Sequence, residues 1–191
     1  MRIMDKHNFN NINSILDEKI NSFLHKPLVT KSLKDTLVLS GGSIKGISQI
    51  GALHCLKKYN MLNGIKTVAG TSVGSMVGLL YIVGYQPIEL FKFLKLIDIN
   101  QLKIISPDNM LTQYGFDDGT RIMLIINKLI NAKGFNSDTV FKDLYKRTKI
   151  EFIVTGTCVN DKKIYYFSHN NYPNMKVLDA VRISMAVPLM F

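Results

Sequence analysis

The order of apolar and polar residues predicts alternating strands and helices in the first half of the chain. Residues 36–40 and 66–70 are short β-branched and aliphatic runs that close on glycines, which is typical of buried strands entering tight loops. Helical spacing follows each run, over residues 47–59 and from the turn at 70–74 to residue 83. This order predicts a parallel sheet with right-handed crossovers.

The second half of the chain is dominated by helical patterns. They cover residues 87–97, 118–131, 137–147 and 175–186. The residues at their starts agree with this interpretation. Pro87 suits a first helical turn, and Asp117 or Asp118 and Ser137 suit N-cap positions.

A hairpin completes the predicted fold. Residues 150–159 and 163–168 are strand-like and flank an Asn-Asp-Lys turn, so they are expected to pair. We therefore expect residues 36–191 to form a three-layer α/β/α domain around a mostly parallel central sheet. Residues 1–35 are expected to form a linker and an amphipathic helix at 12–24, whose apolar stripe suits docking on the domain better than lying on a bilayer.

The chain is basic, and this limits the partners to consider. It has 24 Lys and Arg against 14 Asp and Glu, a net charge of +10, which favours nucleic acid, anionic lipid or acidic protein. The basic residues are scattered and do not alternate with aromatic residues, so a nucleic-acid platform is disfavoured. Peripheral contact with an anionic membrane surface and a simple solvated basic surface both stay open.

Cysteine content and hydropathy give no sign of secretion or membrane insertion. Cys55 and Cys158 are too few for a disulfide framework, and no spacing suggests a metal site. The first residues lack the apolar core of a signal peptide, and the longest apolar run, 73–85, is too short to span a membrane. The expected location is therefore cytoplasmic or peripheral to a membrane.

The first candidate motif is a GxSxG turn between a predicted strand and a predicted helix. Gly70 and Gly74 flank Ser72 at a distance of two residues, where side chains would collide with a sharply turned backbone. Such a turn holds a nucleophilic hydroxyl clear of the backbone, and the positive end of the following helix points toward developing negative charge. The alternative is a strand-to-helix turn that merely needs small residues.

A second glycine loop follows the preceding predicted strand. It consists of Gly41, Gly42, Ser43, Ile44, Lys45 and Gly46. Two such loops on neighbouring parallel strands would face each other across the carboxyl edge of the sheet. Uncovered N–H groups there suit the stabilisation of an oxyanion, with Lys45 adding positive charge. Phosphate binding is disfavoured, because the loop matches neither GxxxxGK[ST] nor GxGxxG.

Together these motifs resemble the signature of the patatin-like phospholipase family. That family pairs a GGGxRG-type oxyanion loop with a GxSxG nucleophile turn, and residues 182–191 are similar to its ASxAxPxxF segment. The resemblance implies a serine lipid acyl hydrolase of the phospholipase A type. It would cleave phospholipid or related lipid esters through an acyl-enzyme on Ser72, without metal or cofactor.

This chain departs from the family pattern at three points. Ser43 replaces the third glycine and Lys45 the arginine, so the charge is kept but the bidentate guanidinium is lost. The family's general base is an aspartate in a DGG or DGA motif after the ASxAxPxxF segment, and that motif does not occur in this chain. The resemblance therefore implies a catalytic domain of which residues 36–191 are the nucleophile-bearing part.

Other residues could act as the base, and two other functions are compatible with parts of this pattern. Asp118 suits a helix cap, Asp161 a hairpin turn and Asp179 a helix, so none is a persuasive base. His169 follows a predicted strand after Ser72 in the chain and could serve a general serine esterase. A third hypothesis is a non-catalytic, membrane-associated module that keeps the fold but lacks the aspartate.

Overall fold

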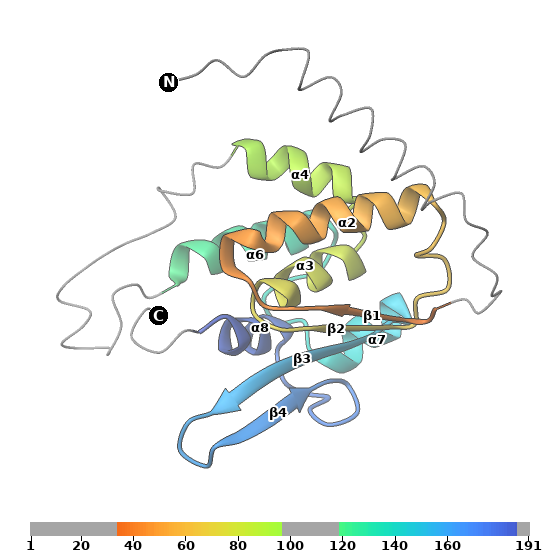
Figure 1. Cartoon of the computed structure of the whole chain (residues 1–191). Helices are drawn as coiled ribbons and strands as arrows, with labels where there is room; N and C mark the ends of the chain where they lie inside the picture. Colours follow the sequence, from red (N-terminus) through yellow and green to blue (C-terminus); the bar gives the residue numbers. More distant parts are fainter. Residues whose placement is uncertain (1–33, 97–118, 187–191) are drawn as a thin grey trace, which may run out of the picture. The chain divides into compact units, whose positions relative to one another are not determined.

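A computed structural model describes residues 34–96 and 119–186 of the chain (Figure 1). The chain divides into two compact units, Met1–Ser32 and Leu33–Phe191. The helix predicted at residues 12–24 lies outside the described residues, as do Asp117, Asp118 and the end of the segment similar to ASxAxPxxF.

A four-stranded sheet runs through the second unit (Figure 1). Its strands are β1 (Thr36–Leu39), β2 (Thr67–Gly70), β3 (Glu151–Cys158) and β4 (Lys163–Phe167). They lie in the order β1-β2-β3-β4; the first three are parallel, and β4 is antiparallel to β3. This confirms the predicted α/β class, the mostly parallel sheet and the hairpin.

Helices connect these strands. Their bounds are η1 Ser43–Lys45, α2 Gly46–Lys58, α3 Val73–Ile82, α4 Pro87–Leu96, α6 Thr120–Ala132, α7 Phe141–Thr148 and α8 Val177–Met185. Every helix predicted within the described residues is present, with bounds shifted by zero to four residues. Pro87 opens α4 as predicted, but Ser137 is not an N-cap, and the N-cap of α6 is Gly119 in place of the predicted Asp117 or Asp118.

The N-cap of α7 is Val140 in place of Ser137, and the local hydrogen bonds explain the later start. The N–H of Asn136 donates to Thr139 Oγ1 at 3.0 Å, and the N–H of Asp138 donates to Asn136 Oδ1 at 3.0 Å. Val140 then forms a β-bridge with Lys176, which keeps its backbone extended. The polar side chains of this segment therefore close a turn before the helix begins.

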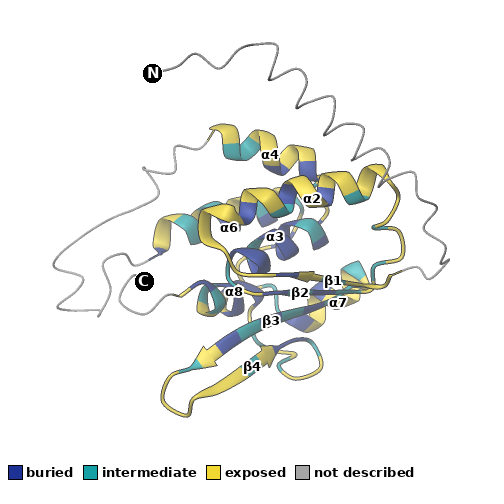
Figure 2. Ribbon diagram, viewed as in Figure 1, coloured by how far each residue is buried: buried dark blue, intermediate teal, exposed yellow. Residues whose placement is uncertain are grey.

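The core lies between the sheet and α3, which is the most buried of the described helices (Figure 2). Gly78 of α3 allows the helix to approach the sheet, because a Cβ atom there would lie 3.0 Å from Val68 and 3.3 Å from Phe152. The helices that contact the sheet do so on this face. On the opposite face, Val38 and Tyr166 leave 73% and 53% of their surface exposed within the described part of the chain.

Candidate active site

Ser72 lies in a strained turn between β2 and α3. Its backbone has φ 52° and ψ −125°, a conformation that side-chain-bearing residues rarely adopt. Strain of this kind costs on the order of 1–3 kcal/mol and persists only where the surrounding structure enforces it. The chain thus reverses sharply at Ser72, whose side chain is half-buried at the N-terminus of α3.

The two flanking glycines are needed because backbone atoms crowd both positions. A Cβ atom on Gly70 would lie 2.5 Å from the Cα atom of Ser75. A Cβ atom on Gly74 would lie 2.6 Å from the carbonyl oxygen of Ser40 and closer still to that of Leu39. Both contacts are with main chain, which cannot rotate away, so the GxSxG spacing is a steric requirement of this turn.

The loop of residues 41–46 lies beside Ser72. Parallel pairing sets Leu39 opposite Gly70, so both loops leave the sheet at the same edge. The Thr71 N–H donates to the carbonyl of Leu39 at 3.0 Å, and a Cβ atom built on Gly41 would lie 3.4 Å from that of Ser72. The structure therefore brings the two predicted glycine loops together.

Within this loop, two positions show why small residues are used. Gly46 packs so closely on α3 that a Cβ atom there would overlap the side chain of Val73. Ser43 has φ 49°, in the left-handed region that glycine adopts most easily. Gly42 has an extended φ of 168°, and its carbonyl accepts the Lys45 N–H at 2.9 Å, which closes a tight turn. Residues 41–45 are exposed.

Four polar side chains that the motifs did not single out hold the turn and loop in place. Ser184 of α8 accepts the Ser72 N–H at 2.8 Å, and the Ser75 hydroxyl donates to the Ser72 carbonyl at 2.6 Å. Thr155 pairs with Thr71 at 2.7 Å between hydroxyl oxygens, and Gln49 donates to the Ser40 carbonyl at 2.6 Å. Only Ser184 carried a signal in the sequence, as the serine of the segment similar to ASxAxPxxF.

The family model for "Patatin-like phospholipase" matches residues 37–191, which is most of the chain. This chain belongs to the patatin-like phospholipase family. A "Probable lipid hydrolase 463L" of Invertebrate iridescent virus 6 is 31% identical over 174 residues, covering 89% of this chain and 58% of that protein. The yeast Meyerozyma guilliermondii has a "Lysophospholipase NTE1" that is 37% identical over 71 residues, covering 37% of this chain and 5% of that protein.

Two solved structures superpose on this chain and share its fold. Full-length ExoU from the type III secretion system of Pseudomonas aeruginosa, in complex with SpcU, superposes with a TM-score of 0.61 at 18% identity, covering 83% of this chain and 39% of that one. VipD from Legionella pneumophila gives a TM-score of 0.59 at 18% identity, covering 84% and 43%. This chain thus spans little more than half of its viral relative and less than half of each of these structures.

The two departures from the family's glycine loop have different structural consequences. At Ser43 the chain adopts a backbone conformation that favours glycine, so the serine carries strain of about 1–2 kcal/mol that the family's usual residue avoids. Its N–H is retained as a potential donor. Lys45 is exposed and at the end of the single turn η1, so its ammonium group adds a positive charge beside the loop.

His169 lies at the wrong edge of the sheet to act on Ser72. Its Nδ1 is 4.0 Å from Glu151 Oε1, and its ring stacks on Tyr145 at 3.8 Å between centroids. Glu151 pairs with Thr67 at the start of β2, whereas Ser72 follows the end of that strand. At about 3.3 Å per residue this separates Glu151 from Ser72 by roughly 15 Å. The sequence-based alternative of a His169 base is therefore wrong.

The carboxylates considered as bases are engaged elsewhere or lie outside the described residues. Asp161 accepts the Lys163 N–H at 3.2 Å and the Tyr165 hydroxyl at 2.5 Å within the hairpin turn. Asp179 is exposed in the first turn of α8, at the end remote from Ser184. Among the described residues, no hydrogen bond joins Ser72 to a carboxylate.

The contact between Asp161 and Tyr165 in the hairpin can be tested through the pKa of Tyr165. Hydrogen bonding and repulsion by the Asp161 carboxylate raise the pKa of Tyr165 to about 12, while the phenol's hydrogen bond lowers the pKa of Asp161. Asp161→Asn is expected to return the pKa of Tyr165 toward about 10, since an amide does not repel a phenolate. The pKa of Tyr165 is measured from tyrosinate absorbance against pH, after the absorbance of a chain that carries Tyr165→Phe has been subtracted. An unchanged titration would contradict the contact.

Ser184 offers a second prediction, because it fixes the backbone of the nucleophile turn. Ser184→Ala leaves the Ser72 N–H without its acceptor, which is expected to lower the free energy of unfolding by about 1–3 kcal/mol. Denaturant unfolding measures the change, and Ser184→Thr, which keeps the hydroxyl, is the matched control. Equal stability of the alanine variant and the native chain would show that this bond does not hold the turn.

Within residues 34–96 and 119–186, no group of three or more His, Cys, Asp or Glu side chains is placed to hold a metal ion. Across the same residues, no helix is both long and apolar enough to cross a bilayer.

Proposed function

We propose that this protein is a serine lipid acyl hydrolase of the phospholipase A type, with Ser72 as its nucleophile. The observation that carries the proposal is the strained backbone of Ser72 at the junction of β2 and α3, with Gly41 beside it. Membership of the patatin-like phospholipase family supports a lipid ester as substrate. The relative named a probable lipid hydrolase supports the same class of reaction.

In the proposed reaction, the Ser72 hydroxyl oxygen attacks the carbonyl carbon of the ester. The developing oxyanion accepts hydrogen bonds from the N–H groups of Gly42 and Ser43, each of which contributes about 2.7–4 kcal/mol in sites of this kind. The N-terminus of α3 begins directly after Ser72, and its dipole favours the same negative charge. Lys45 adds a positive charge at the rim.

The proton of Ser72 needs an acceptor for this attack. We propose an aspartate of the kind that the family carries in a DGG or DGA motif after the segment similar to ASxAxPxxF. It would take the proton from Ser72 and pass it to the departing alcohol oxygen, leaving an acyl-enzyme. Water then attacks the acyl-enzyme carbonyl while the aspartate accepts the water's proton. The aspartate passes that proton to the Ser72 oxygen as the acyl bond breaks, which releases a fatty acid and regenerates the Ser72 hydroxyl.

We further propose that the edge carrying the two glycine loops contacts an anionic membrane surface. Ile44 and Ile47 expose 64% and 45% of their surface and neighbour Lys45 in the sequence, so apolar and basic side chains occur together in and just after the loop of residues 41–46. The net charge of +10 favours the same surface.

Salt should therefore weaken membrane binding. Affinity for vesicles that contain anionic lipid is expected to fall as ionic strength rises, because salt screens charges between the protein and the bilayer. Vesicle co-sedimentation at increasing salt measures this, with zwitterionic vesicles as the control. Salt-independent binding would remove the electrostatic part of the proposal.

Product analysis tests the type of reaction. The full-length protein is incubated with vesicles of a phospholipid whose two acyl chains differ in mass, and the lipids are identified by mass spectrometry. A free fatty acid and a lysophospholipid are expected. Release of the phosphorylated headgroup would contradict acyl hydrolysis. Absence of any product, with binding to the vesicles retained, would favour the non-catalytic membrane module.

A further inference from the structure

Gln49 in the first turn of α2 fixes the backbone just before the loop of residues 41–46. Its side-chain Nε2 donates to the carbonyl oxygen of Ser40 at 2.6 Å. Ser40 lies between the end of β1 and the loop, and α2 begins at the last residue of the loop. This one hydrogen bond therefore joins the strand that precedes the loop to the helix that follows it.

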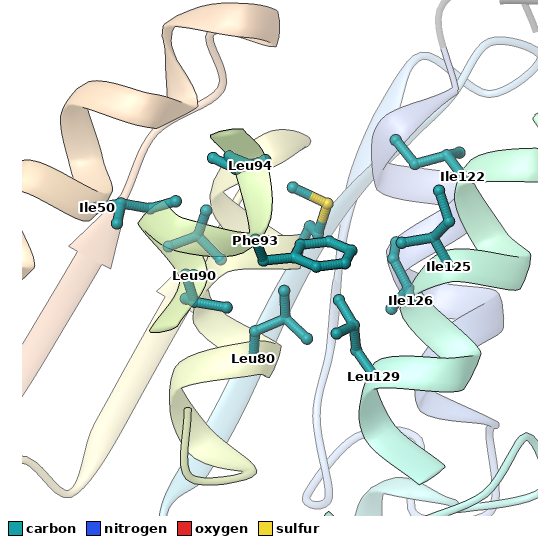
Figure 3. A pocket seen from close by; sticks show the side chains of 11 residues that line it. Ile50, Leu80, Leu90, Phe93, Leu94, Ile122, Ile125, Ile126 and Leu129 are labelled. Carbon is teal, nitrogen blue, oxygen red and sulfur yellow. The ribbon is translucent and has the colours of Figure 1, made fainter. Parts of the chain in front are cut away.

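The helix that carries Gln49 is a firm support for this contact. The next residue, Ile50, is 3% exposed and lines an apolar pocket together with Leu80 of α3 and Leu90 of α4 (Figure 3). These apolar contacts anchor α2 on the neighbouring helices. The amide of Gln49 is therefore presented to Ser40 from a helix whose packing does not depend on the loop.

The other polar atom of the Gln49 amide indicates that packing alone does not explain this side chain. Among the described residues, Gln49 Oε1 is buried and has no hydrogen-bond partner. A buried amide oxygen without a partner opposes folding, and leucine would fill a similar space without that cost. The feature that distinguishes glutamine here is its donor, which is used on Ser40.

The hydrogen bond to Ser40 also sets the direction of the first N–H group of the loop. A trans peptide is planar, so its carbonyl and N–H groups point in opposite directions. Gln49 draws the Ser40 carbonyl toward α2, so the N–H of Gly41 points away from α2. A Cβ atom on Gly74 would lie 2.6 Å from the same carbonyl oxygen, which places that oxygen against the first turn of α3. The Ser40 carbonyl therefore links α2 to the turn that carries Ser72.

The composition of the loop makes such a constraint important. Gly41 and Gly42 have no side chains to resist rotation of the adjoining peptide planes. Residues 41–45 are exposed, so their N–H and carbonyl groups can bond to water in other conformations. Ser43 carries backbone strain at φ 49°, which favours rearrangement. A donor held by α2 opposes these changes.

We propose that Gln49 is a positioning residue for the reaction at Ser72. By holding the Ser40 carbonyl, it keeps the loop in the conformation that presents the N–H groups of Gly42 and Ser43 to the oxyanion. Oxyanion donors act over about 2.7–3.1 Å, and a displacement of about 1 Å can lower a rate by about 10²-fold. This inference rests on the proposed function and adds a residue that controls the rate without touching the lipid.

Gln49→Leu tests the role of the donor. In the full-length protein, it should lower kcat for a short-chain nitrophenyl ester by about 10- to 100-fold and leave KM within about twofold, because oxyanion donors act mainly on the transition state. Gln86→Leu is the matched control, since Gln86 is an exposed glutamine directly before α4, and it should leave kcat unchanged. Circular dichroism verifies that both variants are folded. An unchanged kcat in Gln49→Leu, or an equal loss in both variants, would overturn the proposal.

Gln49→Glu separates hydrogen bonding from packing, because glutamate has the same length as glutamine. A protonated carboxyl donates its O–H to the Ser40 carbonyl, whereas a carboxylate has no proton to donate and repels that oxygen. The rate of this variant relative to that of the native protein should therefore rise as the pH falls from about 8 to about 5, where a half-buried carboxyl facing a carbonyl oxygen gains its proton. A ratio that does not change with pH would contradict the role of the donor.

Crystal structures of the native protein and of Gln49→Leu give a readout that does not depend on hydrolysis. The Ser40 carbonyl is expected to turn away from α2 in the variant, while β1 and α2 stay in place. The same carbonyl direction in both structures would overturn the proposal. Absence of hydrolysis by the native protein would contradict the proposed function, whereas hydrolysis at an undiminished kcat by Gln49→Leu would contradict only the role of Gln49.

Discussion

Replacing Gly74 by alanine is expected to lower the free energy of unfolding by about 3 kcal/mol or more. The added methyl group would lie 2.6 Å from the carbonyl carbon of Leu39 and from the carbonyl oxygen of Ser40. Those atoms belong to the end of β1, which is fixed by its pairing with β2. Relief would require α3 to move away from the sheet, and α3 is the most buried of the described helices. Chemical denaturation monitored by circular dichroism measures the loss.

Gly51→Ala is the matched control for this prediction. Gly51 lies within α2, and a Cβ atom there would have no neighbour within 4 Å. Alanine is favoured over glycine inside a helix, so this change should stabilise the protein by about 0.5–1 kcal/mol. Similar effects of the two substitutions would mean that crowding at Gly74 is not what requires glycine in the motif.

Replacing Ser72 by alanine is expected to reduce hydrolysis of a lipid ester by about 10³-fold or more, because no acyl-enzyme can form without the hydroxyl. The rate that remains would come from binding and from the oxyanion donors. Initial rates on a short-chain nitrophenyl ester and on phospholipid vesicles, compared with the unchanged full-length protein, measure the loss.

Two controls show whether the loss of hydrolysis is due to the missing hydroxyl: the stability of the Ser72→Ala protein and the rate of a second serine variant. The alanine keeps the side chain's Cβ atom and the strained backbone, so the unfolding free energy should change little. Ser137→Ala alters an exposed serine between α6 and α7 and should leave the rate unchanged. Undiminished hydrolysis by the Ser72→Ala protein would mean that another residue is the nucleophile.

The elements of this fold were predictable because their signals are local. The strand-like runs at β1 and β2 close on glycines, and turn residues lie between β3 and β4, so pattern and turn chemistry agreed there. The juxtaposition of the glycine loops also followed, since parallel neighbouring strands must end at one edge. The late start of α7 did not follow, because the local hydrogen bonds of Asn136 and Asp138 act together with a bridge from Val140 to the distant Lys176.

The contacts around Ser72 were harder to predict, because they join residues far apart in the sequence. Ser184 lies 112 positions from Ser72, and although it is the serine of the segment similar to ASxAxPxxF, that resemblance did not predict that its hydroxyl accepts the Ser72 N–H. The position of His169 also depends on the long-range topology of the sheet. This residue follows Ser72 in the chain and lies two residues after the end of β4, yet the antiparallel direction of β4 places it at the opposite edge of the sheet.

The central claim, that Ser72 is the nucleophile, is tested most directly by covalent trapping. The full-length protein is treated with a long-chain alkyl fluorophosphonate, digested, and searched by mass spectrometry for the residue that carries the phosphonyl group. Modification of Ser72 is expected, in step with loss of ester hydrolysis. Loss of hydrolysis with Ser72 unmodified, or with another residue carrying the group, would contradict it.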